Sequence, residues 1–138
     1  VGAYSQAAAA VRFAQAYTQD RTIFGKTVVS PCEGEVVAAV DGLPDLPPPE
    51  ADRDNPAGNH VIVACDGMRV ELAHLRERSV TAAVGARVLA GDPIGAVGNS
   101  GNSTEPHLHI HAVDAGSGKA VQLSFDGRVP SRNAQFSR

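Results

Sequence analysis

The stretch from Asn99 to His111, which reads NSGNSTEPHLHIH, decides how the rest of the chain is interpreted. Its second half alternates histidine with leucine and isoleucine, and a period of two residues is typical of a β-strand with one polar and one apolar face. The first half is rich in Gly, Asn and Ser, which favour a loop. A loop that leads into a strand with three imidazoles on one face indicates metal binding or proton transfer. The alternative is a surface strand that carries histidines by coincidence.

The segments before this stretch are also predicted to be short strands. Residues 27–42 indicate two strands that turn at Glu33-Gly34, and 60–65 indicates a buried strand followed by a turn. Residues 69–75 alternate, which places His74 on the same face as Val70 and Leu72. The 14 glycines and 9 prolines favour strands and turns over helices. We therefore expect an all-β fold of antiparallel strands, either a two-sheet sandwich or a partly open barrel.

The 138 residues are enough for a single domain, 1–138, with its own core. Residues 1–24 form an atypical N-terminal segment, since an alanine-rich run with high helix propensity also shows strand-like alternation. Residues 43–58 form a loop rich in proline and acidic residues. It is interpreted either as a solvated insertion or as the wall of a substrate groove. Residues 127–138 are a polar tail without periodicity.

Charge and composition exclude several classes of protein. The formal net charge is -3, and no lysine and arginine cluster or aromatic series indicates a nucleic-acid partner. No apolar run approaches the length of a membrane span. The start of the chain does not resemble a signal peptide.

Two cysteines, Cys32 and Cys65, are too few to define a cellular compartment. If residues 36–40 and 60–63 pair as a hairpin, both cysteines fall near the same end of it. A disulfide and two buried thiols are then both compatible with the sequence.

Residues 103–109, STEPHLH, resemble the ST-x-PH-x-H signature of the lysostaphin-type (LytM-like) zinc metallopeptidases. Residues 58–63 and 72–75 are similar to this family's GN-x-V-x-I and AHL segments, and 84–98 matches its run of regularly spaced glycines. The resemblance implies the lysostaphin-peptidase fold and cleavage of peptidoglycan peptides in the bacterial cell wall. It also implies an extracellular or periplasmic location.

The resemblance assigns roles to individual histidines. His109, the second histidine of H-x-H, corresponds to a zinc ligand. His107 and His74 correspond to the histidines that move protons and stabilise the oxyanion. His111 and His60 remain auxiliary candidates for a metal. A catalytic zinc needs three protein ligands and a position for water.

One family motif is missing, and this limits the functional prediction. The family carries H-x-x-x-D on an early strand, but no histidine precedes His60, and Asp20 is the only carboxylate nearby. Loss of the metal, ligands outside this chain, or a rearranged ligand set would each explain the gap. Two hypotheses follow: a zinc endopeptidase for cell-wall peptides, and an inactive relative that binds peptidoglycan or a partner cell-wall hydrolase. We expect the 138-residue chain to hold zinc weakly or not at all.

Overall fold

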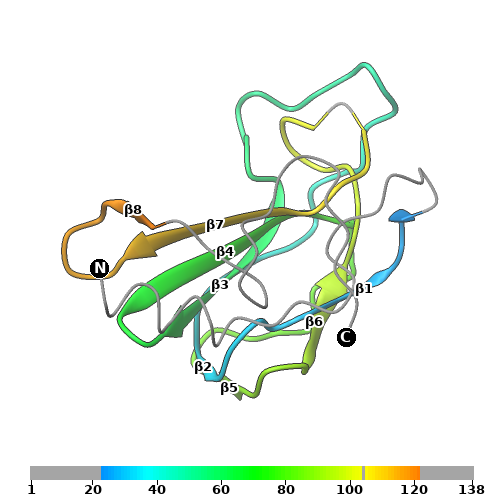
Figure 1. Ribbon diagram of the computed structural model, residues 1–138. Coiled ribbons are helices and arrows are strands. Elements are labelled where there is room, and N and C mark those ends of the chain that lie inside the picture. Colours follow the sequence, from blue (N-terminus) through cyan, green and yellow to red (C-terminus); the bar gives the residue numbers. More distant parts are fainter. Residues whose placement is uncertain (1–22, 104, 122–138) are drawn as a thin grey trace.

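The computed structural model describes residues 23–103 and 105–121, which form an all-β domain (Figure 1). No α-helix occurs in these residues, so the predicted fold class is confirmed. The strands in chain order are β1 (Thr27–Val29), β2 (Gly34–Val40), β3 (Asn59–Cys65), β4 (Met68–Leu75), β5 (Arg87–Val88), β6 (Pro93–Ala96), β7 (His109–Asp114) and β8 (Ala120–Val121).

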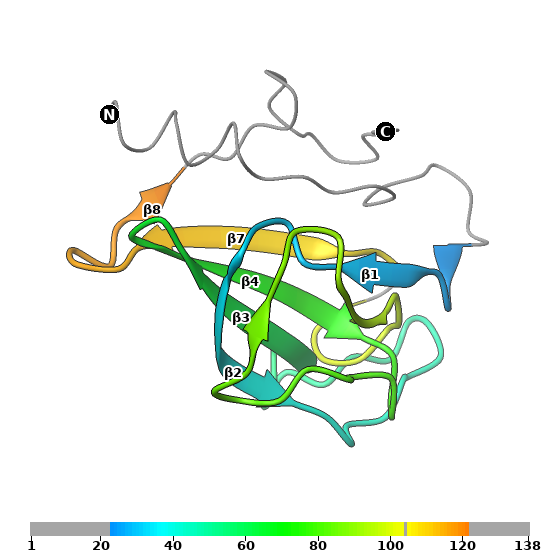
Figure 2. The same cartoon turned by 90° about the horizontal axis from the view of Figure 1, so that it is seen from below.

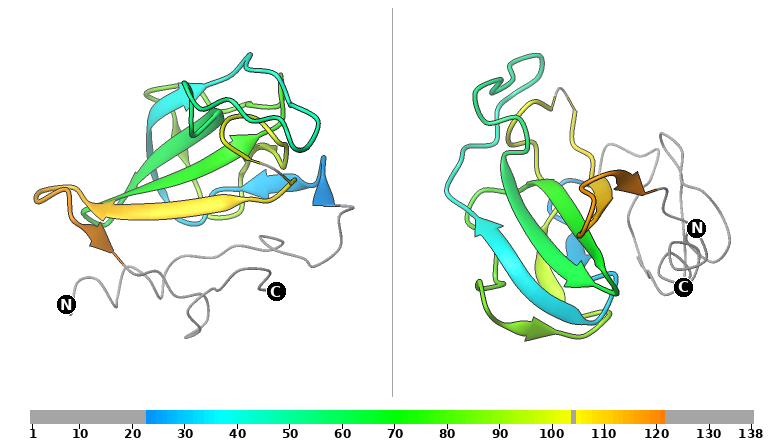
Figure 3. Two further views of the ribbon diagram at one scale, coloured as in Figure 1. Left: turned by 90° about the horizontal axis from the view of Figure 1, so that it is seen from above. Right: turned by 90° about the vertical axis from the view of Figure 1, so that its left-hand side faces the viewer.

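Two antiparallel sheets are formed by these strands. The larger sheet has the order β5-β2-β3-β4-β7-β8, and β1 pairs with β6 in a sheet of two strands. Figure 2 shows the same arrangement from below, and the right-hand view of Figure 3 shows the small sheet behind the large one. The described strands do not close into a barrel, so the two-sheet form of the prediction applies.

The hydrophobic core lies between the two sheets, because side chains from both are buried in one cluster. Val28 of β1 and Ile94 of β6 meet the inward residues of β3 and β4 there. Along β3 every second residue is fully buried, which is the period-two pattern expected from the sequence. The largest fully buried side chains are Leu72, Leu75, Ile94 and Leu108.

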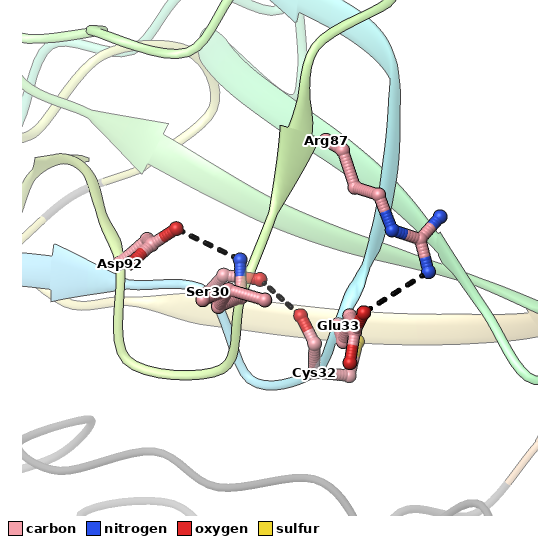
Figure 4. Close-up of polar contacts among 6 residues, drawn as sticks. Ser30, Cys32, Glu33, Arg87 and Asp92 are labelled. Atoms are coloured by element: carbon pink, nitrogen blue, oxygen red, sulfur yellow. Dashed lines mark hydrogen bonds and ion pairs between the residues drawn. The ribbon is translucent and has the colours of Figure 1, made fainter.

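The turn at Glu33-Gly34 does not join a hairpin, although the sequence indicated two strands turning there. β1 pairs with β6, and β2 pairs with β3 and β5, so the chain passes from the small sheet to the large one at this point. Two hydrogen bonds stabilise the chain at this crossing. The Ser30 amide donates to the Asp92 carbonyl at 2.8 Å, and the Ser30 hydroxyl donates to the Cys32 carbonyl at 2.7 Å (Figure 4).

Cys32 and Cys65 form a disulfide with a Cα–Cα distance of 6.1 Å, and both are buried. The pairing of β2 with β3, on which the disulfide alternative depended, is present, with Val36 opposite Val63. This pairing brings the two cysteines to the same end of the hairpin, and the disulfide alternative is therefore the one found.

We expect the Cys32→Ser/Cys65→Ser double variant to lose about 3–4 kcal/mol of unfolding free energy, because the disulfide closes a long loop in the unfolded chain. Urea denaturation of both proteins measures the difference. A free-thiol count by mass spectrometry without reductant should find none in the wild type. Two free thiols would contradict the disulfide.

Candidate functional site

The strand that carries His74 departs from regular alternation just before it ends. Between two register pairs, β3 contributes one residue, His60, whereas β4 contributes two, Ala73 and His74. The extra residue is a β-bulge, a feature that often changes the direction of a side chain near a functional site. His74 has a φ of 61°, which is uncommon for any residue other than glycine.

The bulge changes the neighbours expected for His74. Strict alternation placed this side chain with Val70 and Leu72, but its ring packs against two other imidazoles. Its centroid lies 4.7 Å from that of His107 and 5.8 Å from that of His109. The face prediction for His74 was therefore wrong, and the cause is the inserted residue.

Three of the five histidines thus lie together, and a fourth extends the row. The His111 ring lies 6.2 Å from the His109 ring, with an angle of 25° between the planes. The ring contacts of the described residues do not include His60, whose Nδ1 lies 2.9 Å from the Gly58 carbonyl oxygen. The structure therefore brings together His74, His107 and His109, while the roles that the resemblance gives them stay predictions.

His74 is held by contacts to two loops. Its amide donates to the Ala57 carbonyl at 2.9 Å, and its Nδ1 lies 2.9 Å from the Ser100 carbonyl oxygen. Because a carbonyl oxygen can only accept, Nδ1 carries the proton and Nε2 keeps its lone pair.

Burial keeps the His74 ring neutral at pH 7. Loss of hydration lowers its pKa from 6.5 to about 4, and the positive charges that His107 and His109 acquire on protonation act in the same direction. The hydrogen bond to the Ser100 carbonyl oxygen opposes this effect. The side chain is only 7% exposed, so it is the most buried histidine of the cluster.

His107 and His109 have less enclosed surroundings. The Nδ1 atom of His107 lies 2.9 Å from the Glu105 carbonyl oxygen and 3.1 Å from the Ser103 hydroxyl. Partial burial of the His109 ring lowers its pKa, the Glu71 carboxylate opposes this, and neighbouring histidines add to it. Neutral imidazole is the form that can accept a proton or bind a metal.

The segment 43–58 lies beside the loop that precedes His107, as Figure 1 shows at the top of the molecule. The Asp45 carboxylate accepts the Asn99 amide at 2.7 Å and the Glu77 amide at 3.0 Å. The Asn102 amide donates to the Pro56 carbonyl at 2.9 Å. These bonds join the segment to the histidine loop and to Glu77, while residues 47–50 and 53–56 of the segment are exposed, so both interpretations of the segment stay predictions.

Two glycines allow this close approach. Gly58 and Gly101 have φ values of 62° and 76°, and a Cβ on Gly58 would lie 2.5 Å from the carbonyl carbon of Ser100. Real Cβ atoms do not come this close to a backbone atom. Any side chain at Gly58 would therefore push the two loops apart.

The described residues do not by themselves form a zinc site. In 23–103 and 105–121 no group of three His, Cys, Asp or Glu side chains could hold a metal ion. His109 is the single residue there that the resemblance identifies as a ligand. The place of the family's H-x-x-x-D motif, together with Asp20, lies outside the described residues, so the predicted weakness of zinc binding stays a prediction.

Sequence reasoning overlooked the residues that hold the histidines. Asn99 was interpreted only as a loop former and Ser103 only as a loop residue of the family signature, but both side chains are buried and hydrogen-bonded beside His107. A polar residue in a loop gives no signal of burial until the segment that covers it is known.

The fold and the cluster together define an all-β, peptidase-like domain with several histidines at one end of its large sheet. A family model described as "Peptidase family M23" matches residues 18–123 of the chain. The chain belongs to this family. Among curated proteins, none matches the sequence.

Solved structures show the same fold at low sequence identity. A zinc-containing peptidase from Vibrio cholerae has a TM-score of 0.55 and 22% identity, covering 71% of this chain and 26% of that one. The catalytic domain of the antimicrobial peptidase lysostaphin from Staphylococcus simulans has a TM-score of 0.51 and 24% identity, covering 78% and 68%. A chain of the SpoIIQ–SpoIIIAH pore-forming complex has a TM-score of 0.51 and 23% identity, covering 69% and 52%. The chain thus spans about a quarter of the Vibrio protein.

We expect acidification from pH 7 to pH 4 to destabilise the protein through His74. The unfolded chain binds the proton near pH 6.5 and the folded chain only near pH 4, so stability falls as the pH drops through this window. The loss is about 3 kcal/mol at the lower end. Urea midpoints measured between pH 4 and 7 test this.

The matched variant is His74→Asn, since asparagine tolerates a positive φ and its amide can donate to the Ser100 carbonyl. This variant should show a flatter pH dependence. A smaller slope of the same sign remains, because the lowered pKa of His109 acts in the same direction. An unchanged slope in His74→Asn would contradict the burial argument.

Proposed function

We propose that this M23 domain recognises cell-wall (peptidoglycan) peptides at the His74, His107 and His109 cluster, and that the 138-residue chain binds them without cleaving them. The observation that carries the proposal is that these rings lie together. The ring centroids of His74 and His107 are 4.7 Å apart. A peptidase-type site that keeps its proton-handling histidines but lacks two family ligands retains the means to contact a peptide.

The protonation of the rings supports contacts to a peptide backbone. His74 and His107 each have Nδ1 directed to a carbonyl oxygen, so Nε2 is left as an acceptor. A neutral imidazole with a free Nε2 can accept a hydrogen bond from a peptide amide, or receive a proton from a reacting group. The low pKa of His74 keeps this ring an acceptor at neutral pH.

Hydrolysis is the second candidate function, favoured by the family and by the position of His109 in the H-x-H motif. It depends on a zinc ion with two further ligands, which the described residues do not supply beside His109. A partner cell-wall hydrolase is an alternative to peptidoglycan as the bound molecule. A chain with a similar fold occurs in the SpoIIQ–SpoIIIAH pore-forming complex, which supports a protein partner in general terms.

An extracellular or periplasmic location is part of the proposal. The Cys32–Cys65 disulfide supports it, because disulfides persist in oxidising compartments. In the part of the chain that the structure describes, no helix has the length and hydrophobicity needed to cross a bilayer.

We expect the purified chain to contain well under one zinc per molecule after dialysis, because two of three ligands account for most of the binding free energy. Elemental analysis measures the zinc content. Stoichiometric zinc that is lost in His109→Ala would contradict the expectation and make the peptidase the leading function.

We also expect the chain to sediment with insoluble peptidoglycan and to release no soluble fragments from it. His107→Ala should weaken binding several-fold, whereas the control His60→Ala, a histidine outside the ring cluster, should bind like the wild type. Failure of the wild type to sediment would contradict peptidoglycan binding and leave a protein partner as the alternative.

A further inference from the structure

A buried chain of hydrogen bonds leads from the segment 43–58 to the His107 ring. The Asn99 side-chain amide donates to the Leu46 carbonyl at 2.6 Å, and the Ser103 hydroxyl donates to Asn99 Oδ1 at 2.7 Å. The same hydroxyl oxygen lies 3.1 Å from His107 Nδ1. Asn99 is 3% exposed and Ser103 is 2% exposed, so water does not compete for these bonds.

The directions of these bonds follow from oxygen atoms that can only accept. The Leu46 carbonyl can only accept, so Nδ2 of Asn99 must face it and Oδ1 must face Ser103. Oδ1 also only accepts, and so does the Glu105 carbonyl oxygen, which lies 2.8 Å from the same hydroxyl, so the single Ser103 hydroxyl proton is directed to one of these two oxygens. The lone pairs of the hydroxyl are then left for His107.

The hydroxyl of Ser103 can therefore only accept from the His107 ring. This requires a proton on Nδ1, and the Glu105 carbonyl oxygen at 2.9 Å from Nδ1 requires the same. Free neutral histidine favours the proton on Nε2, so the surroundings reverse its preference.

We propose that Asn99 and Ser103 are positioning residues that hold His107 in the Nδ1–H tautomer: Ser103 accepts from Nδ1, and Asn99, oriented by the Leu46 carbonyl, holds the Ser103 hydroxyl in place. Nε2 of His107 is thereby kept free beside His74. The use of this lone pair on a peptide rests on the proposed function, whereas the tautomer does not.

The segment 43–58 acts on the ring through Asn99, which it holds at three points. Besides the Leu46 carbonyl, the Asp45 carboxylate accepts the Asn99 amide at 2.7 Å, and the Leu46 amide lies 3.4 Å from the Asn99 carbonyl oxygen. A shift of this segment would therefore change the position of Asn99 and, through Ser103, the preference of His107 for one tautomer.

Long-range ¹H–¹⁵N NMR of the metal-free 138-residue chain at roughly pH 8, where free histidine is neutral, reports the tautomer of each ring. In the wild type, His107 should be in the Nδ1–H form. Ser103→Ala should lower the ratio of Nδ1–H to Nε2–H by about 2- to 10-fold, the range for losing one hydrogen bond. Ser103→Thr keeps the hydroxyl and should restore the wild-type ratio.

Asn99→Ala gives a second prediction. Without Oδ1, the Ser103 hydroxyl keeps the Glu105 carbonyl oxygen as an acceptor at 2.8 Å, so it still accepts from His107 and the ratio should fall less than in Ser103→Ala. In the Asn99→Ala/Ser103→Ala double variant, the ratio should equal that of Ser103→Ala. Such non-additivity is expected only if the two residues act on the ring in series.

The matched control is Ser30→Ala, which removes another buried hydroxyl that donates to a carbonyl. Ser30 lies directly after β1, where the chain passes from the small sheet to the large one. It should leave the His107 ratio unchanged. The His74 signal is an internal control, since its Nδ1 proton is held by Ser100. If Ser103→Ala does not fold, Ser103→Cys offers a weaker acceptor and should give an intermediate ratio.

An unchanged His107 tautomer in folded Ser103→Ala and Asn99→Ala would overturn the proposal, and so would an equal change in Ser30→Ala. The measurement involves neither zinc nor peptidoglycan. A failure of the proposed function would therefore leave the tautomer result intact, and a failure of the tautomer prediction would leave peptidoglycan binding to be judged by sedimentation.

Discussion

The site depends on one inserted residue in strand β4. The pairing of β4 with β3 and β7 fixes which side chains face the core, and a regular strand would place His74 among them. The bulge at Ala73-His74 breaks this pattern at the end of the strand, where the cost to the ladder is smallest. A residue with a φ of 61° is retained there because the Ala57, Gly98 and Ser100 backbones all bond to it.

Side-chain hydrogen bonds join the loops around the bulge to one another and to the sheet. Asp45 accepts amides from two loops, and Asn59 bonds to the backbone of Leu43 and Leu75. The contact between Gly58 and the 100–101 backbone leaves no room for a side chain. Such bonding holds the proline-rich segment 43–58 against the loop that precedes His107.

The histidines of this site are arranged for neutrality. Burial lowers the pKa values of His74 and His109, and each ring that gains a proton disfavours protonation of its neighbours. Backbone carbonyls hold the Nδ1 atoms of His74 and His107. These conditions suit hydrogen-bond acceptance, proton transfer and metal binding equally well. Metal binding differs from the other two because it also needs enough ligands around one ion.

The sequence alone determined the all-β class and the placement of His109 and His111 on one strand, whereas His107, predicted on the same strand, lies just before β7. These features follow from local periodicity and turn residues, which act over a few positions. Tertiary structure decided the rest. The bulge at His74 depends on the register between strands, and the choice of a disulfide for Cys32 and Cys65 depends on their distance in space. The bond chain through Asn99 and Ser103 depends on a segment more than 50 residues earlier in the chain, which no local pattern can report.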